Sequence, residues 1–190
     1  MSKKIIYLLI LCIQLTSNLY PCSLCNSKKE VAHVYIDIKT DKDTIKNIDI
    51  IYKFNKTFSL NLLKKYDSNY NGLIDKYEME KISNIFYNYF QKSDYFIKLK
   101  HFPEKTNLKS IKFAKLHIIN TKLLIKNNIM IFNFSLDKKI NFDEKTILYL
   151  LFHDFEQYFS FLILDVQINQ HNYNKDLNDN KVFIKLSSFQ

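Results

Sequence analysis

The sequence is notable for the residue types that it lacks. Among its 190 residues there is one glycine, no arginine and no tryptophan, with only two prolines and three cysteines. Three cysteines are too few for a disulfide-rich miniprotein. A single glycine excludes glycine-rich phosphate loops and a G-x-S-x-G nucleophile motif, which argues against an enzyme. All 28 basic residues are lysines, and against 19 acidic residues they give a formal net charge of +9. Because nucleic-acid recognition usually employs arginine, this charge does not predict a nucleic-acid partner.

What remains is typical of a folded domain. Hydrophobic residues make up 47% of the chain and aromatic residues 15%, a composition that excludes global disorder. No apolar run after residue 20 approaches the ~18 residues that a membrane-spanning helix needs. The sequence therefore predicts that the chain, once its signal is removed, is not an integral membrane protein. We expect a single domain over residues 31–190, a length ample for a hydrophobic core.

The N-terminal residues are typical of a secretory signal peptide. Lys3 and Lys4 precede the apolar stretch Ile5–Leu15, and a cleavage point follows Ser17. The prediction is a signal peptide over residues 1–17, a flexible lead-in over residues 18–30, and export, most naturally to a periplasm. An uncleaved membrane anchor is the alternative interpretation. Cleavage leaves Cys22 and Cys25, spaced C-x-x-C, for which a local disulfide and a thiolate metal clip both stay open.

Hydrophobic periodicity predicts strands on both sides of a helical segment. Alternation over Val31–Lys39 and Ile45–Phe54 predicts a hairpin, and a period near 3.6 follows from Lys56 to Gln91, interrupted by the polar run Asp67–Asp75. The further strands expected are Tyr95–Lys100, Ile111–Ile119, Leu123–Ile125, Ile129–Phe134, Thr146–Phe152, Tyr158–Ile168 and Lys181–Leu186. The stretch Asn174–Asn180 is expected to be a hairpin turn. Together these predict an α+β fold: an antiparallel β-sandwich-like domain with an inserted helix–loop–helix at about residues 57–91.

The segment between the two predicted helices has the twelve-residue pattern of a calcium loop. Calcium prefers six to eight oxygen ligands, which a loop of this kind supplies from its positions 1, 3, 5, 7, 9 and 12. Those positions hold Asp67, Asn69, Asn71, Leu73 through its carbonyl, Asp75 and Glu78. Position 6 needs a turn that glycine makes at little cost, and the only glycine of the chain, Gly72, stands there. The pattern predicts an EF-hand-type site for Ca²⁺.

Two other interpretations of this loop stay open. The first is an Asn/Asp-rich helix connection that matches the pattern by chance. The second is a site that has the right geometry but binds calcium poorly. Three carboxylates predict modest affinity, in the roughly 10⁻⁴–10⁻³ M range of extracellular sites. A lone exported site of this kind is expected to be a structural brace rather than a switch.

Several segments resemble one bacterial family. Ala32–Asp37, the loop Asp67–Glu78 and Ser93–Phe96 are the strongest matches, and His153–Tyr158 matches weakly. They resemble the family numbered 1007 among the domains of unknown function, often labelled the periplasmic component of an ABC-type transport system. The resemblance covers about residues 31–190. It implies a periplasmic protein that works beside a membrane transporter of metal ions or other solutes.

A second metal site is a further hypothesis. His33 and Asp37 share one strand face, and His153 and Asp154 lie near the end of another strand. If these strands are neighbours, their imidazole and carboxylate groups converge on a transition metal such as Ni²⁺ or Co²⁺. The alternative is that His33 is a half-buried strand histidine with a hydrogen-bonded ring.

The expectation is therefore an exported, non-enzymatic calcium-binding protein. Its expected role is that of an accessory or ligand-binding component beside a metal or solute transport system. The first alternative is a calcium-braced interaction module in the cell envelope, and the second is a hydrolase of an unrecognised kind.

Overall fold

The computed structural model describes residues 30–143, 145–169, 172–178 and 180–187. The predictions for the signal peptide, the lead-in, Cys22 and Cys25 lie outside these residues. In the described part the chain forms two β-sheets and two α-helices, which confirms the α+β class. The strands are β1 (Glu30–Asp41), β2 (Thr44–Phe54), β3 (Ile97–Pro103), β4 (Ile118–Lys126), β5 (Ile129–Leu136), β6 (Ile140–Asn141), β7 (Thr146–Phe152), β8 (Phe159–Ile168), β9 (Asn172–Asn178) and β10 (Lys181–Ser187). The helices are α2 (Lys56–Tyr66) and α3 (Lys76–Lys92).

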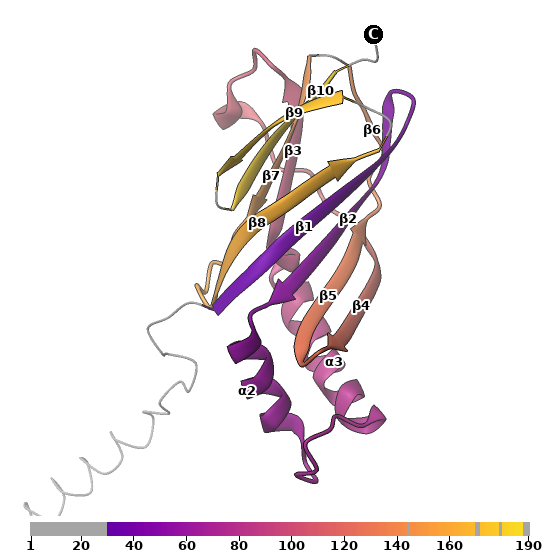
Figure 1. Ribbon diagram of the computed structural model, residues 1–190. Helices are drawn as coiled ribbons and strands as arrows, with labels where there is room; N and C mark the ends of the chain where they lie inside the picture. The colour runs from indigo at the N-terminus through magenta and orange to yellow at the C-terminus, as the bar shows by residue number, and fades with distance from the viewer. Residues whose placement is uncertain (1–29, 144, 170–171, 179, 188–190) are drawn as a thin grey trace, which may run out of the picture.

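The strands form two sheets that face each other (Figure 1). The larger sheet has the order β4-β5-β2-β1-β8, with β6 paired to β2, and the smaller sheet has the order β3-β7-β10-β9. The predicted hairpin is confirmed, because β1 and β2 pair antiparallel with Val34 opposite Tyr52 and Ile36 opposite Ile50. Antiparallel pairing holds for every described strand pair except β1 and β8.

The β1–β8 pair is parallel, which differs from the all-antiparallel prediction. The chain leaves β7 in the smaller sheet and reaches the larger sheet at the end where β1 begins. There the backbone N–H of Glu30 donates to the carbonyl of Tyr158 at 3.0 Å. Because β8 starts beside the start of β1, the two strands run in the same direction.

Aromatic side chains fill the space behind the larger sheet. The Tyr52 ring of β2 contacts Phe152 of β7 edge-on, with 6.1 Å between ring centroids. The same ring lies 5.9 Å from Phe90 of α3. The smaller sheet thus covers one part of the inner face of the larger sheet, and α3 covers the part nearer the helical end (Figure 1). Both contacts belong to one continuous buried cluster of apolar residues.

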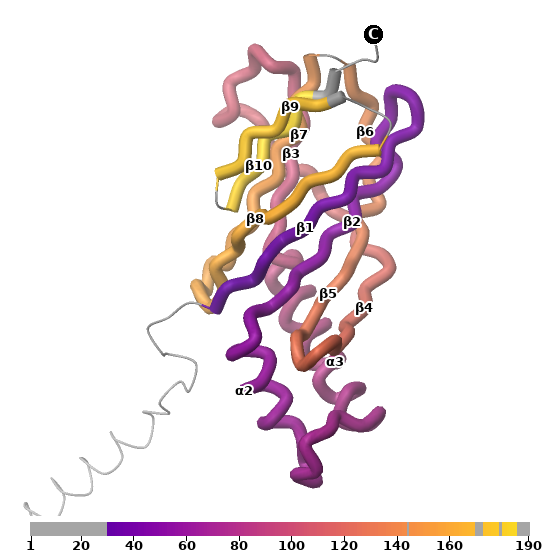
Figure 2. Tube along the Cα trace, viewed as in Figure 1, coloured from indigo at the N-terminus to yellow at the C-terminus, as the bar shows by residue number. Residues whose placement is uncertain are grey.

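The two helices begin at side-chain caps. Asn55 caps α2 by accepting from the Phe58 N–H at 2.7 Å. The buried Ser59 then ties α2 to the sheet, because its hydroxyl oxygen accepts from the Met130 N–H at 3.0 Å. Helix α3 buries Ile82 and Phe86 at the four-residue spacing of one helix face. The helix–loop–helix extends from one end of the sheets (Figure 2).

Two of the expected elements are wrong. The segment predicted as the strand Ile111–Ile119 joins a sheet only from Ile118. Before that residue it runs beside β3, where the Ala114 N–H donates to the Leu99 carbonyl. The predicted turn Asn174–Asn180 lies mostly in β9, the edge strand of the smaller sheet. An edge strand tolerates asparagine and aspartate because one side of its backbone faces solvent.

Candidate functional site

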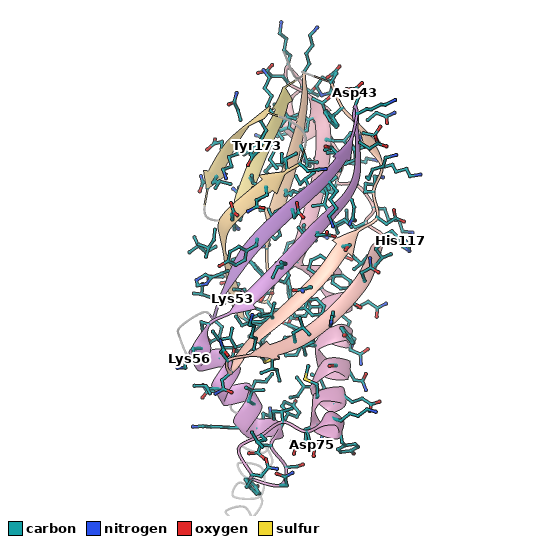
Figure 3. The ribbon with its side chains drawn as sticks, turned by 45° about the vertical axis from the view of Figure 1, so that its right-hand side comes forward. Asp43, Lys53, Lys56, Asp75, His117 and Tyr173 are labelled. Atoms are coloured by element: carbon teal, nitrogen blue, oxygen red, sulfur yellow. The ribbon has the colours of Figure 1, made fainter. Side chains whose placement is uncertain are left out.

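The predicted calcium loop joins α2 to α3 at the far end of the helical extension. Asp75 lies at this end of the molecule and Asp43 at the opposite end (Figure 3). Helix α2 ends at Tyr66, directly before loop position 1, and α3 starts directly after Asp75 at position 9. The sequence pattern and the observed helix bounds therefore place the loop in the same register.

Side chains at three predicted ligand positions fold back onto the loop backbone. Both carboxylate oxygens of Asp67 accept backbone N–H groups, from Asn71 at 3.1 Å and from Gly72 at 2.8 Å. Asn69 accepts from Asn71 at 3.0 Å, and Asn71 accepts from Leu73 at 2.8 Å. Short polar side chains make such Asx-type turns readily. Their oxygens are consequently held against the loop backbone.

Gly72 supplies the turn that this arrangement requires. Its φ of +78° lies in the left-handed region, where a side chain causes strain. A Cβ placed on this residue meets nothing within 4 Å, so the requirement concerns the backbone and not the space around it. The steric need predicted for the only glycine in the chain is thus confirmed.

Glu78 connects the two ends of the loop. One carboxylate oxygen accepts the backbone N–H and the hydroxyl of Ser68, at 2.6 and 2.7 Å. The other accepts the Asp75 N–H, while Asp75 in turn caps the Glu78 N–H, which forms a capping box. The Glu78 side chain is only 1% exposed. Hydrogen bonds, the Ser68 hydroxyl first, outweigh the effect of burial and lower the Glu78 pKa.

The donor set has the chemistry that calcium requires, since every predicted ligand atom is an oxygen. Three of the six ligand positions carry carboxylates, two carry amides and one contributes a backbone carbonyl. Among the residues that the structure describes, no three His, Cys, Asp or Glu side chains gather as metal ligands. The carboxylates of Asp67, Asp75 and Glu78 are therefore not brought together as one ligand group, and each accepts backbone N–H groups instead. Ile74, between the ligand positions, is partly buried and packs against the core.

The loop lies within a segment that one protein-family model recognises. That model, described as protein of unknown function (DUF1007), matches residues 22–179 and so includes all of β9. The chain belongs to the DUF1007 family. This confirms the resemblance drawn from the sequence, while a search of curated proteins gives no match. In the described part of this family member, no helix is long and apolar enough to cross a membrane.

The second predicted metal site does not assemble in this DUF1007 chain. His33 and Asp37 lie on β1, whose neighbours are β2 and β8, whereas His153 and Asp154 follow β7 in the other sheet. The prediction required neighbouring strands, and that condition is not met. Asp154 instead has a structural role. Its buried carboxylate accepts the N–H groups of Glu156, Tyr158 and Phe159 at 2.8–2.9 Å.

A polar cluster on the outer face of the larger sheet was not predicted. Asp49 of β2 lies opposite Asp37 of β1 and opposite Ser135 of β5. It accepts from Ser135 and Asn47, both at 2.6 Å, and pairs with Lys39. Burial raises the Asp49 pKa, but these hydrogen bonds and the Lys39 charge outweigh it, so the pKa is lowered. The alternation of polar residues in β1 and β2 indicates a polar sheet face. Which of these residues lie opposite one another depends on the strand register, which the sequence alone does not give.

Proposed function

We propose that this DUF1007 protein is an exported calcium-binding protein in which one Ca²⁺ ion braces the helix–loop–helix. The observation that carries the proposal is Gly72, the only glycine of the chain, at φ +78° in position 6 of the loop. Side-chain oxygens at three ligand positions already accept hydrogen bonds from the backbone of Gly72 and of its two neighbours in the chain.

The protein residues divide the binding task along the loop. Asp67, Asn69 and Asn71 would contribute side-chain oxygens from the first half, and Asp75 and Glu78 from the second half, with the Leu73 carbonyl between them. Bound calcium supplies positive charge that offsets repulsion between these carboxylates and fixes the two halves together. Glu78 is well placed for this role because it already bonds residues at both ends of the loop. A brace of this kind orients α3, which packs against the larger sheet.

Isothermal titration calorimetry with CaCl₂ tests the proposal. We expect the wild-type chain to bind one ion with a dissociation constant of roughly 10⁻⁴–10⁻³ M. The variant Glu78→Gln removes one ligand charge and should weaken binding at least about tenfold. Glu80→Gln is the matched control, because Glu80 lies two residues further along α3, is exposed and occupies no ligand position. No heat at millimolar calcium, together with a melting temperature that a chelator does not change, would refute the proposal.

Export is the second part of the proposal, and it is supported by the pattern of residues 1–17. Fractionation of cells that produce the full chain should place it outside the cytoplasm. Its mature N-terminus should follow Ser17. A full-length chain in the cytoplasm would contradict this part alone and leave calcium binding untouched.

The proposed role in the envelope is that of an accessory or ligand-binding component beside a metal or solute transporter. Its support is the family resemblance, and a single glycine favours a binding role over catalysis. Affinity purification of the tagged chain from membranes should recover a transporter subunit.

A further inference from the structure

The end of the helix–loop–helix exposes three large apolar side chains. Tyr70 is 89% exposed, Leu73 is 70% exposed and Tyr77 is 73% exposed. All three lie within residues 64–78, the segment that we call the tip. None of them contributes a side chain to the predicted ligand set, and none belongs to the buried core. Neither the fold nor calcium binding therefore accounts for them, and exposed apolar groups gathered in one segment mark an interaction surface.

Three exposed lysines accompany these residues. Lys64 and Lys65 lie in the last turn of α2, and Lys76 begins α3. Over residues 64–78 they stand against three carboxylates, those of Asp67, Asp75 and Glu78, so the formal charge of the tip is zero. One Ca²⁺ ion changes it to +2. Calcium binding would thus convert the tip from a segment of zero formal charge into one that attracts anions.

The shape of the tip favours a lipid surface over a protein partner. The loop is a narrow projection at the end of the molecule (Figures 1 and 2). A stable protein interface usually buries about 800 Å² on each partner. A bilayer needs less, because tyrosine rings settle at the headgroup level and lysines pair with anionic headgroups beside them.

We propose that the calcium-bound tip inserts Tyr70, Leu73 and Tyr77 into the interface of an anionic lipid bilayer. This inference rests on the proposed calcium binding and adds the partner of the same loop. The protein would then meet the membrane end-on, with the sheets held away from the lipid surface by the length of the helices.

Co-sedimentation with vesicles tests the proposal. The full chain is mixed with phosphatidylcholine vesicles containing about 30% phosphatidylglycerol, an anionic lipid, in about 1 mM Ca²⁺ or in chelator. We expect at least about tenfold more protein on the vesicles with calcium, because each added positive charge strengthens attraction to an anionic surface severalfold. Pure phosphatidylcholine vesicles should bind little.

Two variants separate the tip from the rest of the surface. Tyr70→Ser/Tyr77→Ser should lose vesicle binding while its calcium titration stays as in the wild type. Phe155→Ser is the matched control, since Phe155 is equally exposed at 73% but lies in the β7–β8 loop. It should bind vesicles normally. Because the chain contains no tryptophan, Tyr70→Trp provides a single tryptophan, which can be excited selectively and whose emission should shift to the blue on anionic vesicles.

The outcomes distinguish the two proposals. Calcium-dependent sedimentation that the double tyrosine variant loses supports membrane insertion. Calcium binding in the calorimeter without sedimentation overturns the membrane proposal and leaves the calcium proposal intact. Sedimentation that is equal in chelator, or equal on neutral vesicles, also overturns it. Absence of calcium binding in the calorimeter refutes the proposed function itself.

Discussion

Two loops of this protein, the β7–β8 loop and the α2–α3 loop, are organised by carboxylates that accept backbone N–H groups. The loops differ in how many residues supply these acceptors and in how buried the acceptors are. In the β7–β8 loop, Asp154 is only 4% exposed and takes three N–H groups by itself. In the predicted calcium loop the acceptors are spread over several residues, and Asp67 takes two N–H groups at an exposed site. The first loop is a finished structural turn. The second distributes its oxygen acceptors over the residues that our proposal assigns to calcium.

This difference indicates which acidic residues are free for metal chemistry. A buried carboxylate that satisfies several amides cannot leave them without a large cost in stability. Asp154 therefore could not serve the second metal site that the sequence predicted. Asp67 in the predicted calcium loop can change partners at a lower cost, since water replaces the bonds that it gives up. Glu78 is buried as Asp154 is, and its present bonds to Ser68 and Asp75 would be costly to give up.

The largest effect is expected from Asp154→Ala. Removal of the carboxylate leaves three N–H groups without their acceptor, one of them buried, and should lower the free energy of unfolding by about 3 kcal/mol. Equilibrium unfolding in urea measures the loss. Glu156→Ala in the same loop is the control, because this exposed residue should change stability by less than about 0.5 kcal/mol. A similar loss in both variants would mean that Asp154 does not organise the loop.

Calcium should stabilise the protein by a comparable amount through the other loop. At 100 times its dissociation constant, the ion should raise the free energy of unfolding by ~2.7 kcal/mol. Asp67→Ala should lose this increment, whereas Asp154→Ala should keep it despite its lower baseline. Thermal melts with and without calcium measure both variants. An increment lost in Asp154→Ala as well would show that the two loops are coupled.

Gly72→Ala should have an intermediate effect. Alanine fits the space at this position but not the φ of +78°, so a destabilisation of about 1 kcal/mol is expected even in chelator. Gly72→Asn should recover part of the loss, because asparagine tolerates the left-handed region better than alanine does. Urea unfolding of both variants in chelator gives the comparison. Equal stability of wild type and Gly72→Ala would contradict the backbone requirement.

The sequence predicted the elements whose hydrophobic pattern is regular. The alternation in β1 and β2 and the four-residue spacing of Ile82, Phe86 and Phe90 in α3 agree with the observed buried faces. The predicted strands Leu123–Ile125 and Ile129–Phe134 pair as a hairpin, and the turn between them is made by Asn127 and Asn128, whose φ values are +53° and +58°. Such patterns could be interpreted from the sequence because neighbouring residues alone determine the local structure.

Features that depend on contacts between distant segments were missed. The sequence does not show that β8 runs parallel to β1, nor that the polar β9 pairs with β10 as an edge strand. Asp94, Tyr95 and Phe96 all have positive φ, which no glycine signals. The Tyr52 hydroxyl and the His153 N–H hold this turn by donating to the carbonyls of Tyr95 and Phe96, both at 2.8 Å. In the candidate site, the ligand pattern was visible, but the bonds from Ser68 to Glu78 required the folded loop.

The smallest effect concerns a third kind of carboxylate, that of Asp49, which is neither buried in a turn nor exposed at the tip. Because its pKa in the folded protein lies below the ordinary 3.8, ionised Asp49 stabilises the fold above that pH. This contribution is lost as the pH falls through the lower, folded-state pKa. Asp49→Asn should remove that part of the acid dependence and cost less than about 1 kcal/mol near neutral pH, since Lys39 is largely exposed. Urea unfolding from about pH 6 to about pH 2 measures it.

Ser135→Ala, which removes one hydrogen bond but keeps the charge, should retain a weaker acid dependence. If Asp49→Asn lost stability below pH 3.8 as steeply as the wild type, the acid response would belong to other carboxylates. Asp49 would then contribute little to the stability of the sheet, in contrast to the contribution expected of Asp154 to its loop.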